Sequence, residues 1–255
     1  MGESLRSFFD ELEAPSRHLV VLNRSSPDPV RKLLDSLLDG QPVAISAAAS
    51  ESASDDDVVA LVEDGSIVAR STLDELLESV LLINSDLYKT GAIELDDVAL
   101  PDVLTGLDEV PFRVRGYPAS NKEKLLLIVV SRVIERIAVE HGGGTLRASF
   151  QRLSRIHDER GTRSVYERIA GTGVDVHLYG VGDAGSVSAL PVTVHTGTSY
   201  PYRRSWFVVF TPPEGADGDH VALLALEDEP NVWDGFWTFR PELVTRIERY
   251  IAEEI

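Results

Sequence analysis

The alternation of apolar and polar positions predicts a small α/β unit in the first third of the chain. Short apolar runs indicate strands, and an apolar stripe with a period of three to four residues indicates a helix. Asp64-Gly65 predicts a tight hairpin, because glycine readily adopts the positive φ that a type I′ turn requires. Ser71-Thr72 and Asp74-Glu75 supply a capping box for the helix that follows. The expected order is β-α-β-β-β-α, over residues 18–23, 29–39, 42–47, 58–63, 66–70 and 73–82.

A stretch rich in chain-breaking residues separates this unit from the rest of the chain. Residues 84–119 contain three prolines and three glycines, and their only signs of order are a helical turn after Pro101 and a short strand over residues 112–114. We therefore expect a connector that lies over the surface. The predicted division is an N-terminal α/β unit at residues 1–83, a connector at 84–115 and a larger domain at 116–255.

The remaining residues follow a pattern typical of an α+β domain. A broad apolar stripe predicts a long helix that ends at the run Gly142-Gly143-Gly144, and the strands that follow have hairpin spacing. We expect an α+β fold in which a mostly antiparallel sheet is flanked by helices, preceded by the smaller α/β unit. The predicted helices cover residues 122–140, 163–170 and 243–251, and the predicted strands cover 145–150, 174–179, 191–195, 206–211, 221–227 and 233–239.

The chain is strongly acidic and poor in lysine. Its 255 residues carry 42 acidic and 24 basic side chains, for a net charge of −18, and only four of the basic residues are lysines. A surface rich in carboxylates suits molar salt, where the Debye length falls to about 3 Å and like charges are screened. We interpret the composition as halophilic, with an ordinary acidic protein as the alternative. The charge is uneven, because residues 1–120 carry 23 acidic and 9 basic side chains (net −14) and residues 121–255 carry 19 and 15 (net −4).

The same data disfavour several classes of protein. The longest apolar run, residues 125–130, is far too short to span a bilayer, and residues 1–10 lack the features of a signal peptide. We therefore expect a cytoplasmic protein without membrane insertion, and the negative charge disfavours nucleic-acid binding. The chain has no cysteine, which excludes disulfides and thiolate metal sites. It has no phosphate loop, nucleophile elbow, zinc-binding helix or dinucleotide fingerprint, so we expect no enzyme, metal or cofactor.

Three sets of residues are candidates for a binding role. His177 and His195 fall on strands that could be neighbours, although His177 lies on a polar face that suits a solvated side chain. The arginine-rich segment 147–168 fits either an anion site or a structural crossing whose arginines pair with nearby acids. All three tryptophans fall in the last quarter of the chain, where they fit either a core or the lining of a ligand pocket.

Several segments of the second half are similar to one known family. The most specific are the strand end Ser149-Phe150-Gln151-Arg152 and the strand Phe236-Trp237-Thr238-Phe239. They resemble the DICT domain, a sensory module named for its occurrence in diguanylate cyclases and two-component systems. The resemblance covers residues 115–252, and the first 115 residues resemble the N-terminal part of halophilic archaeal members. The other similar segments are residues 122–125, 132–135, 166–170, 204–209, 222–225 and 235.

The resemblance implies a cytoplasmic input module for which the family supplies no agreed catalytic residues. We expect a sensory or adaptor protein of a signal-transduction system that binds a small ligand or a protein partner and lacks an output domain of its own. The alternative, which rests on no family, is an enzyme of unrecognised type that uses dispersed polar residues such as His157, Asp158 and Glu159.

The candidate binding site lies where a predicted strand gives way to a connection, a common place for binding groups on a rigid scaffold. Side-chain alternation puts Ser149 and Gln151 on one face of that strand and Phe150 and Arg152 on the other. Arg152 offers a guanidinium group for an anionic ligand or a partner's carboxylate. The predicted ligand-binding residues are Ser149, Phe150, Gln151, Arg152, Trp206 and Trp237.

Overall fold

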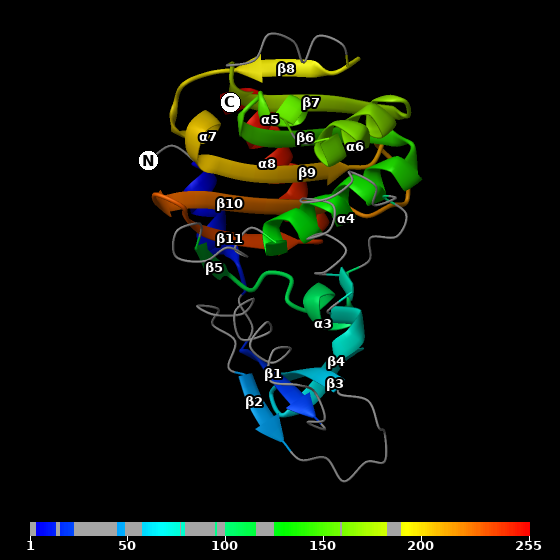
Figure 1. The fold of residues 1–255 in the computed structure, drawn as a ribbon, viewed down its shortest axis with the longest axis vertical. Coiled ribbons are helices and arrows are strands. Elements are labelled where there is room, and N and C mark those ends of the chain that lie inside the picture. The colour runs from blue at the N-terminus through cyan, green and yellow to red at the C-terminus, as the bar shows by residue number, and fades with distance from the viewer. Residues whose placement is uncertain are drawn as a thin grey trace.

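Two sheets follow one another along the long axis of the molecule (Figure 1). The structure is a computed structural model. No helix among the residues it describes is long and apolar enough to cross a membrane. The described residues are 4–13, 16–22, 45–48, 58–76, 78–79, 95, 100–115, 125–158, 160–182 and 190–255.

The smaller sheet is formed by the N-terminal part of the chain. Its strands are β1 (Arg17–Leu22), β2 (Ile45–Ala48), β3 (Val58–Glu63) and β4 (Ser66–Thr72), in the order β2-β1-β3-β4. β1 is parallel to β2 and antiparallel to β3. Asp64 and Gly65 have φ of 51° and 79°, which confirms the predicted hairpin. The predicted capping box is also present, because the backbone N–H of Thr72 donates to Glu75 Oε2 (2.7 Å) and that of Glu75 to Thr72 Oγ1 (3.2 Å).

The larger sheet is formed mainly by the second half of the chain. Its strands are β5 (Phe112–Arg115), β6 (Gly143–Arg152), β7 (Gly173–Val181), β8 (Thr193–Thr196), β9 (Ser205–Thr211), β10 (Val221–Glu229) and β11 (Val232–Thr238). Their order is β5-β11-β10-β9-β6-β7-β8. The neighbours β6, β7 and β8 are parallel, and the remaining pairs are antiparallel. The predicted α+β fold with a mostly antiparallel sheet is therefore confirmed.

Helices cover both faces of the larger sheet (Figure 1). They are η1 (Leu5–Glu11), α4 (Leu125–His141), α5 (Arg155–Asp158), α6 (Arg160–Ala170), α7 (Tyr200–Arg204) and α8 (Pro241–Glu254). α4 and α6 pack on one face, and α8 and η1 pack on the other. Gly142 has φ of 67° and its N–H donates to the backbone oxygen of Ala138 at 3.1 Å, so the predicted helix stop is confirmed.

Two hydrophobic cores lie on opposite faces of the larger sheet, and the one beneath α4 and α6 continues into the smaller sheet through Leu19, Val59 and Leu61. β9 contributes Val208 and Phe210 to the core beneath α4 and α6, and Phe207 and Val209 to the core beneath α8. Phe8 of η1 is fully buried in the second core, although it lies far away in the sequence. The residues of η1, Leu5–Glu11, therefore pack with the larger sheet and not with the smaller one.

A short helix and the segment after it join the two sheets. α3 (Asp102–Thr105) packs against β3 and β4, and β5 then pairs with β11. A side chain at Gly106 would lie 2.7 Å from Leu61 Cδ2, so glycine permits close approach to the smaller sheet. The helical turn and the strand predicted within the connector are both present. The predicted helix over residues 29–39 lies outside the described residues, and the separability of the predicted domains stays a prediction.

Candidate functional site

Buried polar side chains fasten the end of β6 to the start of β9. Ser149 Oγ donates to the backbone oxygen of Ser205 at 3.1 Å and accepts from the backbone N–H of Phe207 at 2.8 Å. Gln151 Nε2 donates to the same Ser205 oxygen at 2.6 Å. Gln151 has φ of 50°, and the pairing with β7 shifts between Ser149 and Arg152, so the strand is irregular here. The polar groups of Ser149 and Gln151 thus hold two strands together, because each finds its partner inside the protein.

The other two residues of the predicted strand end face different surroundings. Phe150 is half-buried and meets the edge of the Tyr166 ring, with centroids 5.2 Å apart. Arg152 is exposed. Nearby Arg155 donates from Nη1 to Gln151 Oε1 at 2.9 Å. Arg152 is therefore the exposed charged residue among the predicted site residues.

The two tryptophans of the predicted site lie on the α4 face and apart from Ser149 and Gln151. Trp206 is half-buried, and its Nε1 donates to Ser131 Oγ of α4 at 3.1 Å. Trp237 is only 2% exposed and packs against the ring of Phe112, with centroids 5.5 Å apart. Of the two predicted roles for the tryptophans, a place in the core fits Trp237, whereas Trp206 keeps part of its surface accessible.

A row of interacting side chains crosses β6, β7 and β8 on the α8 face. Arg147 donates from Nη1 to Tyr179 Oη at 2.8 Å and from Nε to Glu248 Oε1 of α8 at 2.7 Å. The Tyr179 ring stacks on His195, with centroids 4.3 Å apart and planes 6° apart. Burial raises the pKa of Tyr179, and the Arg147 guanidinium opposes that effect. This row ties the centre of the sheet to its edge strand β8.

The two candidate histidines meet at that edge. His177 Nδ1 and His195 Nε2 are 3.0 Å apart, and His177 Nε2 lies 2.9 Å from Asp175 Oδ2. The pKa of His195 is lowered, first by burial and then by the charges of His177 and Arg147. In the described part of the chain, no three acidic or histidine side chains are placed to hold a metal ion together. The pair is therefore a hydrogen-bonded dyad rather than a ready ligand set.

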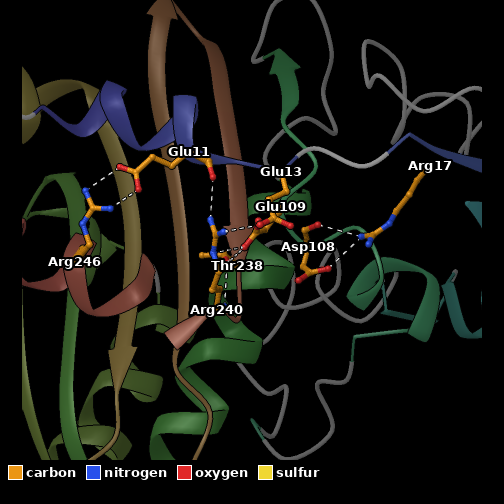
Figure 2. Close-up of polar contacts among 8 residues, drawn as sticks. All are labelled: Glu11, Glu13, Arg17, Asp108, Glu109, Thr238, Arg240 and Arg246. Carbon is orange, nitrogen blue, oxygen red and sulfur yellow. Dashed lines mark hydrogen bonds and ion pairs between the residues drawn. The ribbon is translucent and has the colours of Figure 1, made fainter. Parts of the chain in front are cut away.

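Charged side chains also gather where the two sheets join (Figure 2). On one side, Arg17 of β1 contacts Glu63 Oε2 at 2.9 Å and Asp108 Oδ1 at 3.2 Å, and it donates to the backbone oxygen of Gly106. Burial raises the pKa of Asp108, and its hydrogen bond and charge interaction with Arg17 oppose that effect. The segment after α3 is thereby fixed to the smaller sheet.

The next residue of that segment is fixed to the larger sheet. Glu109, which has φ of 58°, donates its backbone N–H to the oxygen of Trp237 at 2.8 Å. Its carboxylate accepts from Thr238 Oγ1 at 2.9 Å and lies 3.0 Å from Arg240 Nε. Arg240 also donates to the backbone oxygen of Glu11 at 3.0 Å (Figure 2). Asp108 therefore binds the smaller sheet, and Glu109 binds the larger one. We call the contacts among Arg17, Asp108, Glu109, Thr238 and Arg240 the junction.

A buried ion pair lies between α4 and α6. Arg132 donates from Nη1 to Glu135 Oε2 at 2.6 Å and from Nη2 to Thr162 Oγ1 at 3.0 Å. Burial raises the pKa of the Tyr166 phenol well above its ordinary value, and the charge of nearby Glu135 raises it further. Each charge has a partner inside the helix layer, which is the arrangement that buried charges need.

Comparison with known proteins identifies the class of domain. Residues 103–227 match the family model of DICT, the sensory domain in diguanylate cyclases and two-component systems. The chain therefore contains a DICT domain, and the resemblance to this family is confirmed; the strand end Ser149 to Arg152 lies within the matched stretch, whereas the strand Phe236 to Phe239 lies beyond it. The matched stretch begins within α3 and ends in β10, so it includes the junction segment and β5.

The other comparisons add little. No curated protein matches the chain. Among solved structures, polyphosphate kinase from Porphyromonas gingivalis is similar with a TM-score of 0.38 and 9% sequence identity. That similarity covers 97% of this chain and 47% of the kinase chain, so this chain spans about half of that protein. A similarity of this size carries no argument about function.

Sequence reasoning missed the junction and the partners of Arg147. Arg147 pairs with Glu248, which is 101 positions away, so the segment 147–168 is not simply a crossing with local ion pairs. Arg163, by contrast, pairs locally with Glu167 at 2.8 Å. A charged residue flanking the predicted strand 233–239, namely Arg240, was the signal available for the junction, but its partner Glu109 lies in the predicted connector.

Proposed function

We propose that this protein is a cytoplasmic sensory or adaptor module of a signal-transduction system, which binds a small ligand or a protein partner. The observation that carries the proposal is the match of residues 103–227 to a sensory domain of signalling proteins. The proposed role is binding and not catalysis. The side chains of His157, Asp158 and Glu159, on which the enzyme alternative depends, lie outside the described part of the structure.

Within the predicted ligand site, Arg152 is the group best placed to receive a ligand. Ser149 and Gln151 already use their polar atoms to join β6 to β9, as Ser205 shows by accepting from both. Arg152 is exposed at the end of the strand, and Phe150 next to it is half-buried. An exposed guanidinium on a rigid strand end suits an anionic ligand or a partner's carboxylate, because it offers two parallel donors.

The junction offers a route by which binding could be passed between the sheets. Asp108 is bound to Arg17 of the smaller sheet, and adjacent Glu109 is bound to Thr238 and Arg240 of the larger sheet. Because neighbouring residues are fixed to different sheets, a shift of one sheet must strain contacts to the other. We propose that this segment couples the larger sheet to the smaller sheet.

A ligand test follows from the position of Arg152. We expect citrate or inorganic phosphate, titrated in molar KCl, to raise the thermal unfolding midpoint of the wild type, since a ligand stabilises the state that binds it. Arg152→Ala should abolish that rise and change the free energy of unfolding by no more than about 0.5 kcal/mol, because the side chain is exposed.

The matched control is Arg163→Ala, which removes another solvent-accessible arginine, from α6. It should leave the ligand response unchanged. An equal response in the Arg152 and Arg163 variants would place the anion site elsewhere. A loss of several kcal/mol of stability in Arg152→Ala would make the arginine a structural partner and remove it from the site.

A further inference from the structure

β8 is a short edge strand with few contacts of its own. Among the described strands it pairs only with β7, and three of its four residues are exposed. The half-buried exception is His195, whose ring stacks on Tyr179 and whose Nε2 lies 3.0 Å from His177 Nδ1 of β7. The histidine pair is therefore a principal side-chain link between the edge strand and the sheet.

The hydrogen bonds of the pair determine where its protons lie. An ionised carboxylate can only accept, so the contact with Asp175 Oδ2 requires that Nε2 of His177 carry the proton. Neutral His177 then has a bare Nδ1, which must accept from the Nε2–H of His195. The remaining basic nitrogen is Nδ1 of His195. A first added proton can bind there without breaking the bond between the two rings.

A second added proton has a different effect. It must bind to His177 Nδ1, which is the acceptor of the inter-ring hydrogen bond, so that bond breaks. Both rings then carry a positive charge, with facing nitrogens that were only 3.0 Å apart. Like charges at such a distance repel strongly at the partly buried edge of a protein. The pair can hold one extra proton and remain closed, but it cannot hold two.

The charged and titratable groups around the pair come from each element packed there. β7 supplies Asp175 and Tyr179, β6 supplies Arg147, α8 supplies Glu248 and α7 supplies Tyr202. Burial, and then the charges of His177 and Arg147, lower the pKa of His195, and Arg147 is itself paired with Glu248.

We propose that His177 and His195 form a proton-sensing site, which holds β8 on the sheet while the pair carries at most one extra proton and releases β8 when both rings are charged. The ligand of this site is the proton itself. That the release serves as a signal rests on the proposed sensory function, whereas the release itself does not.

Hydrogen exchange of the full chain, followed by mass spectrometry between pH 7.5 and pH 5, tests the proposal in molar KCl. After correction for the intrinsic pH dependence of exchange, the protection of residues 193–196 should fall about tenfold or more in the wild type. His195→Gln and, as a second variant, His177→Gln should remove this fall, since glutamine cannot be protonated in this range.

The control is His18→Gln, which removes an exposed histidine from β1 in the other sheet and should leave the fall at residues 193–196 unchanged. Protection that stays constant with pH in the wild type, or that falls equally in His195→Gln, would overturn the proposal. The citrate and phosphate titration of Arg152→Ala is a separate measurement. If the proposed ligand binding is wrong, the titration shows no rise in the unfolding midpoint, and the pH dependence of exchange at residues 193–196 is unaffected. If the proton-sensing site is wrong, the exchange shows no pH dependence, and the titration is unaffected.

Discussion

The two sheets of this protein differ in how fully they are covered. β10 of the larger sheet has an unbroken run of six buried residues, Val221 to Leu226, because helices pack on both faces. β4 of the smaller sheet has Ile67 and Val68 at 43% and 51% exposure. The pairing of β3 with β4 also shifts between Leu61 and Val62, an irregularity typical of edge strands. Among the described residues, the larger sheet therefore contains most of the apolar burial that stabilises folding.

Charge widens this difference. The first 120 residues carry a net charge of −14, against −4 for residues 121–255. The part with less apolar burial thus has the greater self-repulsion, which only dissolved salt or local arginines can relieve. The comparison teaches that the smaller sheet is the more sensitive to salt, although its Leu19, Val59 and Leu61 belong to the same hydrophobic core as the α4 face of the larger sheet.

The largest effect should come from salt. Lowering KCl from molar to about 0.1 M lengthens the Debye length from about 3 to about 10 Å, so the acidic N-terminal half should lose its structure first. Limited proteolysis at low salt should cut within residues 58–76 and leave the N-terminal piece bound to the C-terminal one, because η1 packs in the core beneath α8 and β5 pairs with β11. Fragment masses and the denaturant midpoint at each KCl concentration measure this. A midpoint that does not change with KCl contradicts the halophilic interpretation.

The second prediction tests whether η1 belongs to the larger sheet. Phe8 is completely buried and meets Tyr250 of α8 edge-on, with ring centroids 5.7 Å apart. Phe8→Ala should lower the free energy of unfolding by about 3–5 kcal/mol, as truncation of a buried aromatic does. Val68→Ala, at an exposed position, should cost no more than about 0.5 kcal/mol. Similar costs for the two variants would show that η1 is not packed as described.

The third prediction concerns the junction. Arg240→Ala leaves the Glu109 carboxylate, which is 11% exposed, without its cation and should cost about 2–4 kcal/mol in urea unfolding. Arg246→Ala is the matched control, because Arg246 lies further along α8, is 46% exposed and pairs with Glu11. It should cost about 0–1 kcal/mol. Equal costs would mean that the Glu109 pair contributes no more than a surface ion pair.

The smallest effect should be a pH dependence from Asp108. Because burial raises the pKa of its carboxyl in the folded state, the protonated form is favoured there. The stability that this group contributes is complete below its ordinary pKa of about 4 and is lost as the pH rises through the folded pKa. Unfolding of the wild type, measured against Asp108→Asn from pH 4 upward, should show this decline. An increase with pH would mean that Arg17 dominates instead.

Local patterns were enough to predict most elements of this fold. The hairpin at Asp64-Gly65 and the capping box at Thr72 and Glu75 are determined by neighbouring residues, so they could be predicted and are present. η1 and α7 were not predicted, because a helix of one or two turns shows no sustained apolar period. The parallel pairing of β6 with β7 was also not specified, since strand spacing alone does not reveal which strands become neighbours.

The contacts of the candidate site could likewise be predicted only in part. Alternation along the strand correctly separated Phe150, which packs against Tyr166, from Ser149, which bonds to Ser205 on the other side. It also allowed His177 and His195 to meet, and they lie 3.0 Å apart. The contact between Arg147 and Glu248 could not be derived, because it joins residues 101 positions apart through the packing of α8.

The sequence by itself determined the strands, the long helices, the acidic character and the resemblance to DICT, because these depend on side-chain periodicity, turn chemistry and composition. Only the tertiary structure decided that Phe8 completes the core of the larger sheet and that Asp108 and Glu109 bind different sheets. It also decided that His177 and His195 link the edge strand β8 to β7. The physical reason is that burial and ion pairing depend on which distant surfaces meet, and no local pattern contains that information.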